Sequence, residues 1–362
     1  MRMAEATISV SAHVGSLTES RKREHIETVL NANVAAKGVT TGFEMFAFEH
    51  CALPELDLDD IDLSTTVFGK YLRAPLLISS MTGGAENGGV INRRLAECAQ
   101  ELGLAMGLGS QRAAIEQAEL ADTYKVRDFA PDILLFANLG AVQLNYGYGV
   151  EQARRAADMI DADALFIHLN PLQEAVQAEG DRNWRGILTK LEELIRKIEI
   201  PVVVKEIGNG ISADLARRFI SIGVAGIDVA GAGGTSWSEV EANRQSDPLI
   251  RKVAHSFAGW GIPTVHSLVE VRREAGSLPV FASGGLRTGI DIAKAIRLGA
   301  TMCGVAAPAL VAADEDTETV TKHVQCLIEE LRISAFCTGA KNLRDLTRAP
   351  LRRVNDWSKV DL

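Results

Sequence analysis

Polar side chains that could bind or act on a small molecule follow directly after one apolar segment. Residues 164–167 read ALFI, and His168, Asn170, Gln173 and Glu174 come within the next seven residues. An imidazole, two amides and a carboxylate can hydrogen-bond a ligand or take part in proton transfer. On an extended strand end, His168 and Asn170 share a face and can point toward one site. A buried strand that ends in these groups indicates a functional site at its carboxyl end.

The same change from apolar to polar residues recurs along the chain. Seven further apolar runs end in polar or glycine-rich segments, at 75–81, 104–110, 133–140, 201–207, 226–232, 279–285 and 302–308. Amphipathic helical segments separate the runs. Eight continuous apolar strands that alternate with helices predict a parallel sheet closed into a (β/α)₈ TIM barrel, an α/β fold. Chemistry in such a barrel is located at the carboxyl ends of the strands.

No linker, repeat or low-complexity segment divides the chain, so we expect one domain over residues 1–362. Residues 1–74 are expected to form a helical and extended N-terminal arm that contributes substrate contacts, residues 75–340 the barrel, and residues 341–362 a C-terminal tail. Ile26 and Val29 predict the apolar face of a helix in the arm. The stretch 237–263 is longer than one helix requires and is expected to be a long loop after the sixth strand.

Composition and charge exclude several classes of protein. The net charge of −9, with 47% hydrophobic and 23% charged residues, indicates a soluble globular protein and argues against nucleic-acid binding. The five cysteines are well separated and form no CxxC pair, so neither a disulfide framework nor a zinc site is expected. No apolar run approaches the roughly 18 residues of a membrane span, and no secretory signal is evident. A cytoplasmic protein without a membrane partner is predicted.

The last two strand ends predict a phosphate site. Phosphate sites in these barrels form from the loops after strands seven and eight and a short extra helix, whose N-terminus favours an anion. The stretch GAGG at 231–234 lacks the spacing of a dinucleotide fingerprint. We therefore expect a phosphate to be held by Thr235, the turn Gly285, Leu286 and Arg287, and the helix start at Ala306 and Ala307.

Lys205 ends the fifth strand and is expected to point into the barrel. It could pair with a delocalised anion such as the N1–O2 edge of a reduced flavin. Alternatively, a neighbouring acid neutralises it, although strand alternation turns the adjacent Glu206 the other way. With Met81, Thr82 and Asn138 opposite the phosphate site, a flat ring would fit the barrel mouth. The pattern predicts FMN.

These segments together resemble the type 2 isopentenyl diphosphate isomerases, the FMN-dependent form, from Arg21 to the C-terminal region. The motifs that carry the resemblance are RKREH (21–25), SSMTGG (79–84), GLGSQR (107–112), HLNPLQE (168–174), VVVKEIGNG (202–210), AGAGGTSW (230–237) and SGGLRTG (283–289). The resemblance implies FMN in a TIM barrel, Mg²⁺ on the diphosphate, and NADPH or NADH to reduce the flavin. It also implies a cytoplasmic homo-oligomer, commonly a tetramer, that interconverts isopentenyl and dimethylallyl diphosphate.

The resemblance assigns roles to individual residues, with Glu174 on Mg²⁺. The implied substrate ligands are Arg21, Lys22, His25, Ser110, Gln111, Arg112, Asn170 and Gln173. The implied FMN ligands are Ser80, Met81, Thr82, Ser110, Asn138, Lys205, Thr235, Gly285, Leu286, Arg287, Ala306 and Ala307. Without the resemblance, the basic residues at 21–25 would be a solvated helix face; Arg23 is left on the surface in either case.

The reaction adds a proton at one carbon and removes another two carbons away, without net redox change. Gln173 is a poor acid and a poor base near neutral pH, so it cannot protonate an alkene alone. Reduced flavin carries a proton on N5 and could be the missing acid. Gln173 would then orient the reacting groups or relay a proton. His168 either assists the catalysis or is a buried histidine whose hydrogen bonds are made within the protein.

Two other functions are compatible with parts of the pattern. An FMN-dependent 2-hydroxy acid oxidase on the same barrel carries a catalytic histidine and arginine after a late strand. Here that place reads AGAGGTSW, with neither residue. A non-catalytic phosphate-binding barrel would need neither Lys205 nor HLNPLQE.

Overall fold

The computed structural model describes residues 20–356 and contains a closed barrel of eight parallel strands. The strands are β4 (Leu76–Ile78), β5 (Ala105–Gly107), β6 (Leu134–Gly140), β7 (Ala164–Leu169), β8 (Val202–Glu206), β9 (Gly226–Asp228), β10 (Val280–Ala282) and β11 (Met302–Val305). Strand β11 pairs with β4 and closes the barrel. All eight predicted strands and the predicted fold class are confirmed.

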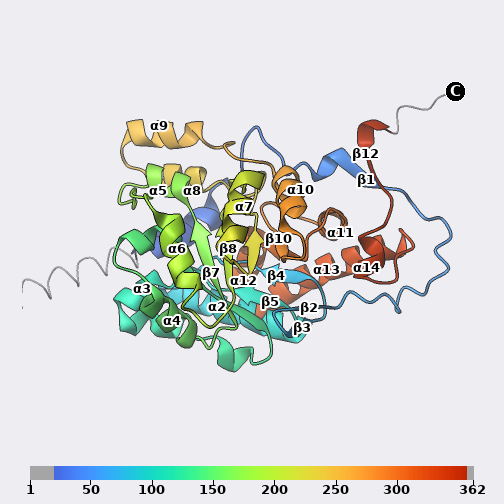
Figure 1. Cartoon of the computed structure of the whole chain (residues 1–362), viewed down its shortest axis with the longest axis horizontal. Coiled ribbons are helices and arrows are strands. Elements are labelled where there is room, and N and C mark those ends of the chain that lie inside the picture. Colours follow the sequence, from blue (N-terminus) through green and yellow to red (C-terminus); the bar gives the residue numbers. More distant parts are fainter. Residues whose placement is uncertain (1–19, 357–362) are drawn as a thin grey trace, which may run out of the picture.

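Helices enclose the barrel (Figure 1). The longer ones are α2 (Glu86–Leu102), α4 (Val150–Asp158), α6 (Ile187–Ile195), α7 (Ala213–Ser221), α10 (Thr264–Ala275), α11 (Gly289–Arg297), α12 (Ala307–Glu315) and α13 (Thr317–Phe336). Short helices are α3 (Arg112–Glu116), α5 (Pro171–Val176), α14 (Leu343–Leu346), η1 (Phe43–Met45), η2 (Ala118–Thr123), η3 (Arg127–Phe129), η4 (Ala141–Asn145) and η5 (Val354–Asp356). Side-chain caps fix several starts; for example, Thr288 Oγ1 accepts from Asp291 N before α11.

The barrel interior is apolar in its lower part and polar at its mouth. Phe136 on β6 and Phe166 on β7 belong to the buried interior cluster, and their rings stack at 4.2 Å. Two residues further along the same strands, alternation brings Asn138 and His168 to the inward face. Side chains that can bind a ligand therefore lie directly above a packed hydrophobic floor.

The opposite end of the barrel is closed by part of the N-terminal arm. Strands β2 (Thr65–Val67) and β3 (Lys70–Leu72) form an antiparallel hairpin where only an extended chain was expected. Phe68 and Gly69 connect them with φ of 48° and 79°, which is typical of a type I′ turn. The ring of Phe68 contacts Phe136 and Phe281 edge-on. Strand β1 (Phe46–Phe48) pairs separately with β12 (Leu351–Arg353).

The predicted loop at 237–263 is wrong, because most of it is helical. Helices α8 (Trp237–Arg244) and α9 (Pro248–Ser256) lie there, and α9 is at the outside of the molecule (Figure 1). The side chain of Asp247 accepts from Leu249 N and Ile250 N, which caps α9. In α8 polar and apolar residues are buried alike, so the sequence shows no amphipathic period there.

A helix over 20–31 lies at the barrel mouth and confirms the helix predicted in the arm. Ile26 is buried, and Val29 packs against the core. The chain that follows is fixed to the segment between β9 and α8, since Ala36 N donates to Gly234 O and Ser236 N donates to Val34 O, both at 2.8 Å. This attachment places the polar face of the helix over the strand ends.

Candidate active site

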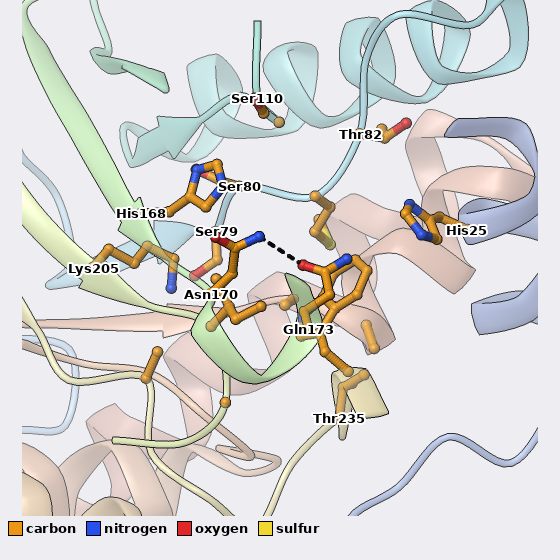
Figure 2. Close-up of a pocket in the computed structure, with 18 of the residues that line it drawn as sticks. His25, Ser79, Ser80, Thr82, Ser110, His168, Asn170, Gln173, Lys205 and Thr235 are labelled. Carbon is orange, nitrogen blue, oxygen red and sulfur yellow. Dashed lines mark hydrogen bonds between the residues drawn. The ribbon is translucent and has the colours of Figure 1, made fainter. Parts of the chain in front are cut away.

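One pocket at the carboxyl ends of the strands collects the predicted functional residues (Figure 2). The helix over 20–31 contributes Arg21, Lys22 and His25 to its lining. Among all residues predicted for the substrate, FMN and metal sites, Gln111 alone does not line this pocket. The predicted residues, which are up to 286 positions apart (Arg21 and Ala307), are therefore brought together around a single cavity.

Gln111 has a structural position instead. It is fully buried; its Nε2 donates to Ala156 O at 2.7 Å, and its Oε1 accepts from Asn138 N at 3.0 Å. Both ends of the amide are thus occupied by backbone groups. The prediction that Gln111 binds the substrate directly is not supported by this placement, and the residue instead positions Asn138.

His168 is held as a neutral imidazole. Its Nδ1 lies 2.8 Å from Asn138 Oδ1, and since an amide oxygen only accepts, Nδ1 carries the hydrogen. Burial, together with the charges of Lys22 and Lys205, lowers the pKa of His168 to about 3. The side chain can therefore accept a hydrogen bond at Nε2, but it is not a cationic acid near neutral pH.

Lys205 points into the barrel as predicted, and an acid that the sequence analysis missed lies beside it. Lys205 Nζ is 3.0 Å from Asp228 Oδ2, and Ser283 Oγ donates to Asp228 Oδ1 at 2.7 Å. Glu206 faces away, and its Oε2 accepts three backbone N–H bonds from residues 207–209. One feature of the sequence could have pointed to Asp228, because it is the only charged residue in the apolar run 226–232.

The amide of Gln173 is fixed at both ends. Its Oε1 accepts from Asn170 Nδ2 at 3.1 Å, the contact drawn in Figure 2, and its Nε2 donates to Glu241 Oε1 at 2.8 Å. These partners determine which end of the amide is oxygen and which is nitrogen. Glu241 lies on α8, within the stretch expected to be a loop, and was therefore missed.

Glu241 also binds the N-terminal arm. His25 Nε2 lies 2.9 Å from Glu241 Oε1, and Arg244 Nη1 donates to Glu241 Oε2 at 2.6 Å. Burial alone would raise the pKa of Glu241, but the hydrogen bond and charge of His25 and the charge of Arg244 outweigh it and lower this pKa to about 2. Arg244 further pairs with Glu24 at 2.8 Å. One ionised carboxylate thus holds both Gln173 and the arm.

Three cations, Arg21, Lys22 and Arg112, form what we term the cation cluster. Burial and then the charges of Arg21 and Arg112 lower the pKa of Lys22 to about 7. Arg112 is paired with Glu116 at 2.7 Å and Asp181 at 2.6 Å. Mutual repulsion in a buried position is relieved by an anion, so the cluster suits a highly charged ligand. By contrast, the side chain of Arg23 is 62% exposed.

Glu174 is the predicted metal ligand and is well held. Its Oε1 accepts from Asn170 Nδ2 at 2.8 Å, and its Oε2 accepts from Asp181 N at 2.7 Å. No group of three or more His, Cys, Asp or Glu residues that could hold a metal occurs among residues 20–356. Mg²⁺ commonly uses one or two carboxylates and completes its shell with water and phosphate oxygens, so a single glutamate fits it.

A second part of the pocket that could hold an anion consists mainly of backbone. Gly284 and Gly285 have φ of 98° and 86°, and a Cβ on Gly285 would lie 2.8 Å from the carbonyl carbon of Gly233. Together with Leu286, Arg287 and the start of α12 at Ala306–Ala307, they line the pocket and form what we term the backbone cradle. Thr235, beside it, also lines the pocket.

Several buried hydroxyl groups in the same pocket make no hydrogen bond within the described chain. Ser79 Oγ, Ser80 Oγ and Thr82 Oγ1, and also Asn170 Oδ1, have no hydrogen-bond partner within the described chain. Buried polar groups are normally satisfied, so these atoms indicate a bound polar ligand. A phosphate end in the cradle and free donors and acceptors along the strand ends fit FMN.

No helix of residues 20–356 is long and apolar enough to cross a bilayer.

Comparisons with known proteins give the family. Residues 153–353 match the FMN-dependent dehydrogenase family model. The chain is 60% identical over 334 residues to an isopentenyl-diphosphate delta-isomerase of Synechocystis sp., covering 92% of this chain and 96% of that protein. It is 55% identical over 337 residues to the enzyme of that name from Stutzerimonas stutzeri, covering 93% and 97%.

Solved structures support the fold. A flavocytochrome b2 double mutant with bound sulfite matches with a TM-score of 0.67 at 18% identity, covering 93% of this chain and 84% of that one. A mandelate oxidase mutant matches with a TM-score of 0.61 at 18% identity, covering 87% and 90%. At this identity the likeness concerns the barrel alone, whereas the relatives above share the sequence over nearly their whole length. The chain belongs to the FMN-dependent, type 2 isopentenyl-diphosphate delta-isomerase family.

Proposed function

We propose that this protein interconverts isopentenyl and dimethylallyl diphosphate, with FMN in its reduced form and Mg²⁺ on the diphosphate. The observation that carries the proposal is that one pocket has two separate anion-binding ends. The backbone cradle suits the phosphate of FMN, and the cation cluster suits the diphosphate of a second molecule. Gln173, with its amide oriented at both ends, lines the same pocket.

Binding of the diphosphate would use Arg21, Lys22 and Arg112 directly. Arg112 can exchange Asp181 for phosphate oxygens, because both are anionic acceptors of a guanidinium. Glu174 would hold Mg²⁺, which bridges to the diphosphate and neutralises its charge. Ser110 lines the same part of the pocket, and its carbonyl accepts from Lys22 Nζ at 3.4 Å.

Proton transfer is the chemical problem, since none of the neutral amides and imidazoles over the strand ends is an acid of adequate strength. Reduced FMN, when bound, supplies a proton donor and acceptor at N5. Gln173 has one further amide hydrogen beyond the one given to Glu241, and this hydrogen can orient the reacting group. His168, neutral and accepting at Nε2, can help to hold a proton-bearing group.

The decisive experiment is an anaerobic assay of photoreduced enzyme with isopentenyl diphosphate and Mg²⁺ but without NADPH or NADH. We expect many turnovers per flavin with no reductant consumed, because the flavin acts as an acid and a base. Oxidised enzyme is the control and is expected to be inactive. Equal activity of the oxidised enzyme, or oxidation of reductant in step with product, would contradict the mechanism.

We also propose that NADPH or NADH reduces the flavin and that the enzyme is a cytoplasmic homo-oligomer, with a tetramer favoured by its family. Stopped-flow absorbance of oxidised holoenzyme mixed with each nucleotide would rank the two reductants. Light scattering coupled to size-exclusion chromatography would give the oligomer size, and a monomer at micromolar concentration would contradict this proposal.

A further inference from the structure

Three side chains on neighbouring strands form a charged unit in the wall of the barrel mouth. Lys205 on β8 is directly opposite Asp228 on β9 in the register, and Ser283 follows β10. Lys205 Nζ is 3.0 Å from Asp228 Oδ2 and 3.3 Å from Ser283 Oγ, which itself donates to Asp228 Oδ1. Asp228 is fully buried, and Lys205 is 6% exposed. A buried lysine and its counter-ion are therefore held in one fixed geometry.

Only two of the three side chains, Lys205 and Ser283, face the pocket. Lys205 and Ser283 line the cavity, whereas Asp228 does not line it and contacts both of these residues from behind the cavity wall. A buried ion pair of this kind is weak support for stability, because apolar residues of similar volume often serve as well. A contribution to stability alone therefore does not explain why an aspartate occupies this position in an apolar strand.

The other ionisable groups around the pair compensate Lys205 less than Asp228 does; burial raises the pKa of Glu206 to about 7, and the charge of Lys205 is the smallest of the causes that oppose this rise. His168, opposite Lys205 on β7, is neutral. Glu206 turns away and binds backbone N–H groups. Cys303 on β11 is a buried thiol whose pKa is raised by burial and then by the charge of Asp228. Lys22 from the arm adds positive charge. In the described chain, the ion pair made by Lys205 is with Asp228.

We propose that Asp228 is a positioning residue that offsets the charge of Lys205 and so disfavours the anionic form of bound reduced FMN. The inference rests on the proposed FMN site. Reduced flavin is a weak acid, and its anion is favoured by an uncompensated cation within a few ångströms. Paired with Asp228, Lys205 still offers an N–H donor, but the unit presents no net charge. A neutral reduced flavin is a better proton donor than its anion, which suits acid–base chemistry.

The test measures the ionisation of bound reduced flavin rather than activity. FMN-loaded wild type and Asp228→Asn are photoreduced under anaerobic conditions, and their absorption spectra are recorded against pH. In Asp228→Asn we expect the ionisation to move to lower pH by about one unit or more, which is the effect of a nearby opposite charge. The midpoint potential should rise in parallel, because the reduced state is stabilised.

Two further variants separate charge from structural damage. Asp228→Asn combined with Lys205→Met is neutral again, so its ionisation should return toward the wild-type pH. Glu206→Gln removes the adjacent carboxylate that faces away, and it should move the ionisation much less than Asp228→Asn does. Asp228→Ser removes the same charge with a smaller side chain and carries the test if Asp228→Asn fails to fold or to hold FMN.

The outcomes distinguish this inference from the proposed function. An ionisation that is unmoved or raised when Asp228 is replaced would overturn the role of Asp228 and leave the FMN site standing. The same conclusion would follow if the double variant Asp228→Asn with Lys205→Met kept the shifted ionisation of Asp228→Asn. Wild-type protein that binds no FMN would instead overturn the proposed function, and this inference with it.

Discussion

The backbone cradle and the cation cluster, the two ends of the pocket proposed to hold anions, differ in whether backbone or side-chain groups form them. The backbone cradle consists of a turn between glycines at positive φ and the start of α12, all fixed by the barrel. The cation cluster is made of long side chains, two of which are supplied by a helix outside the barrel. Backbone groups are positioned at no cost in side-chain entropy, whereas lysine and arginine must be ordered. The cradle therefore suits a tightly bound cofactor, and the cluster suits a substrate that binds and dissociates in each turnover.

The largest effect should follow from filling the cradle. Gly285→Val adds a side chain at φ 86°, where a Cβ would lie 2.8 Å from the carbonyl carbon of Gly233. We expect FMN affinity to fall about a hundredfold or more, since backbone strain of roughly 1–3 kcal/mol adds to the clash. Absorbance of FMN retained after desalting, with circular dichroism for folding, measures this. Gly147→Val is the matched control, because Gly147 has φ 85° with no atom within 4 Å of an added Cβ.

Glu174→Gln should alter the metal response while the flavin stays bound. Removal of the carboxylate leaves Mg²⁺ with a neutral ligand, and we expect the Mg²⁺ concentration for half-maximal activity to rise about tenfold or more. Titration of activity with Mg²⁺ measures the effect. Glu179→Gln, at an exposed position five residues further on, should behave as wild type. An unchanged Mg²⁺ requirement in Glu174→Gln would remove this residue from the metal site.

Loss of one member of the cation cluster should have an effect of similar size that is confined to binding of the substrate. Arg21→Ala is expected to raise KM for the diphosphate about tenfold or more, since hydrogen bonds to charged groups contribute roughly 1.5–3 kcal/mol. FMN affinity and Tm should change little. Arg23→Ala on the same helix is the control, because that side chain is mostly exposed. Equal kinetics of the two variants would make the basic segment a solvated helix face.

The smallest effect concerns one proton. Because the pKa of Lys22 is lowered to about 7, its amine is mostly neutral at pH 8.5 in the free enzyme. A bound diphosphate favours the ammonium and raises this pKa, so binding should take up close to one proton near pH 8.5 but only about half a proton at pH 7. Calorimetry of oxidised enzyme with isopentenyl diphosphate, in two buffers of different ionisation enthalpy, counts it. Lys22→Met should abolish the uptake, whereas uptake that persists would assign it to another group.

The sequence was sufficient for the barrel and for most of the pocket lining. Eight apolar runs separated by helices define the strands, and strand polarity places their polar ends at one mouth. Lys205 was predicted to point inward and Glu206 outward by alternation alone, and both do. These features depend on local patterns, which a sequence displays directly.

Side chains that act through tertiary contacts could not be predicted in the same way. Asp228 pairs with a residue on the neighbouring strand, and Glu241 bonds with His25, which is 216 residues away. Helix α8 is buried on several sides and lacks an amphipathic period, so Glu241 was not even assigned to a helix. Gln111 is the opposite case: it lies between two pocket residues in the sequence, but its side chain is buried and bonds to backbone groups.

The shared carboxylate of Glu241 has a consequence for rebuilding this enzyme. His25 and Gln173 bind the same oxygen of Glu241, at 2.9 and 2.8 Å. An arm exchanged with that of a distant relative would therefore change the setting of Gln173 unless α8 were exchanged with it. The helix over 20–31, α8 and the segment after β7 should therefore be exchanged together, because a change in the arm at His25 also reaches the amide of Gln173 through Glu241.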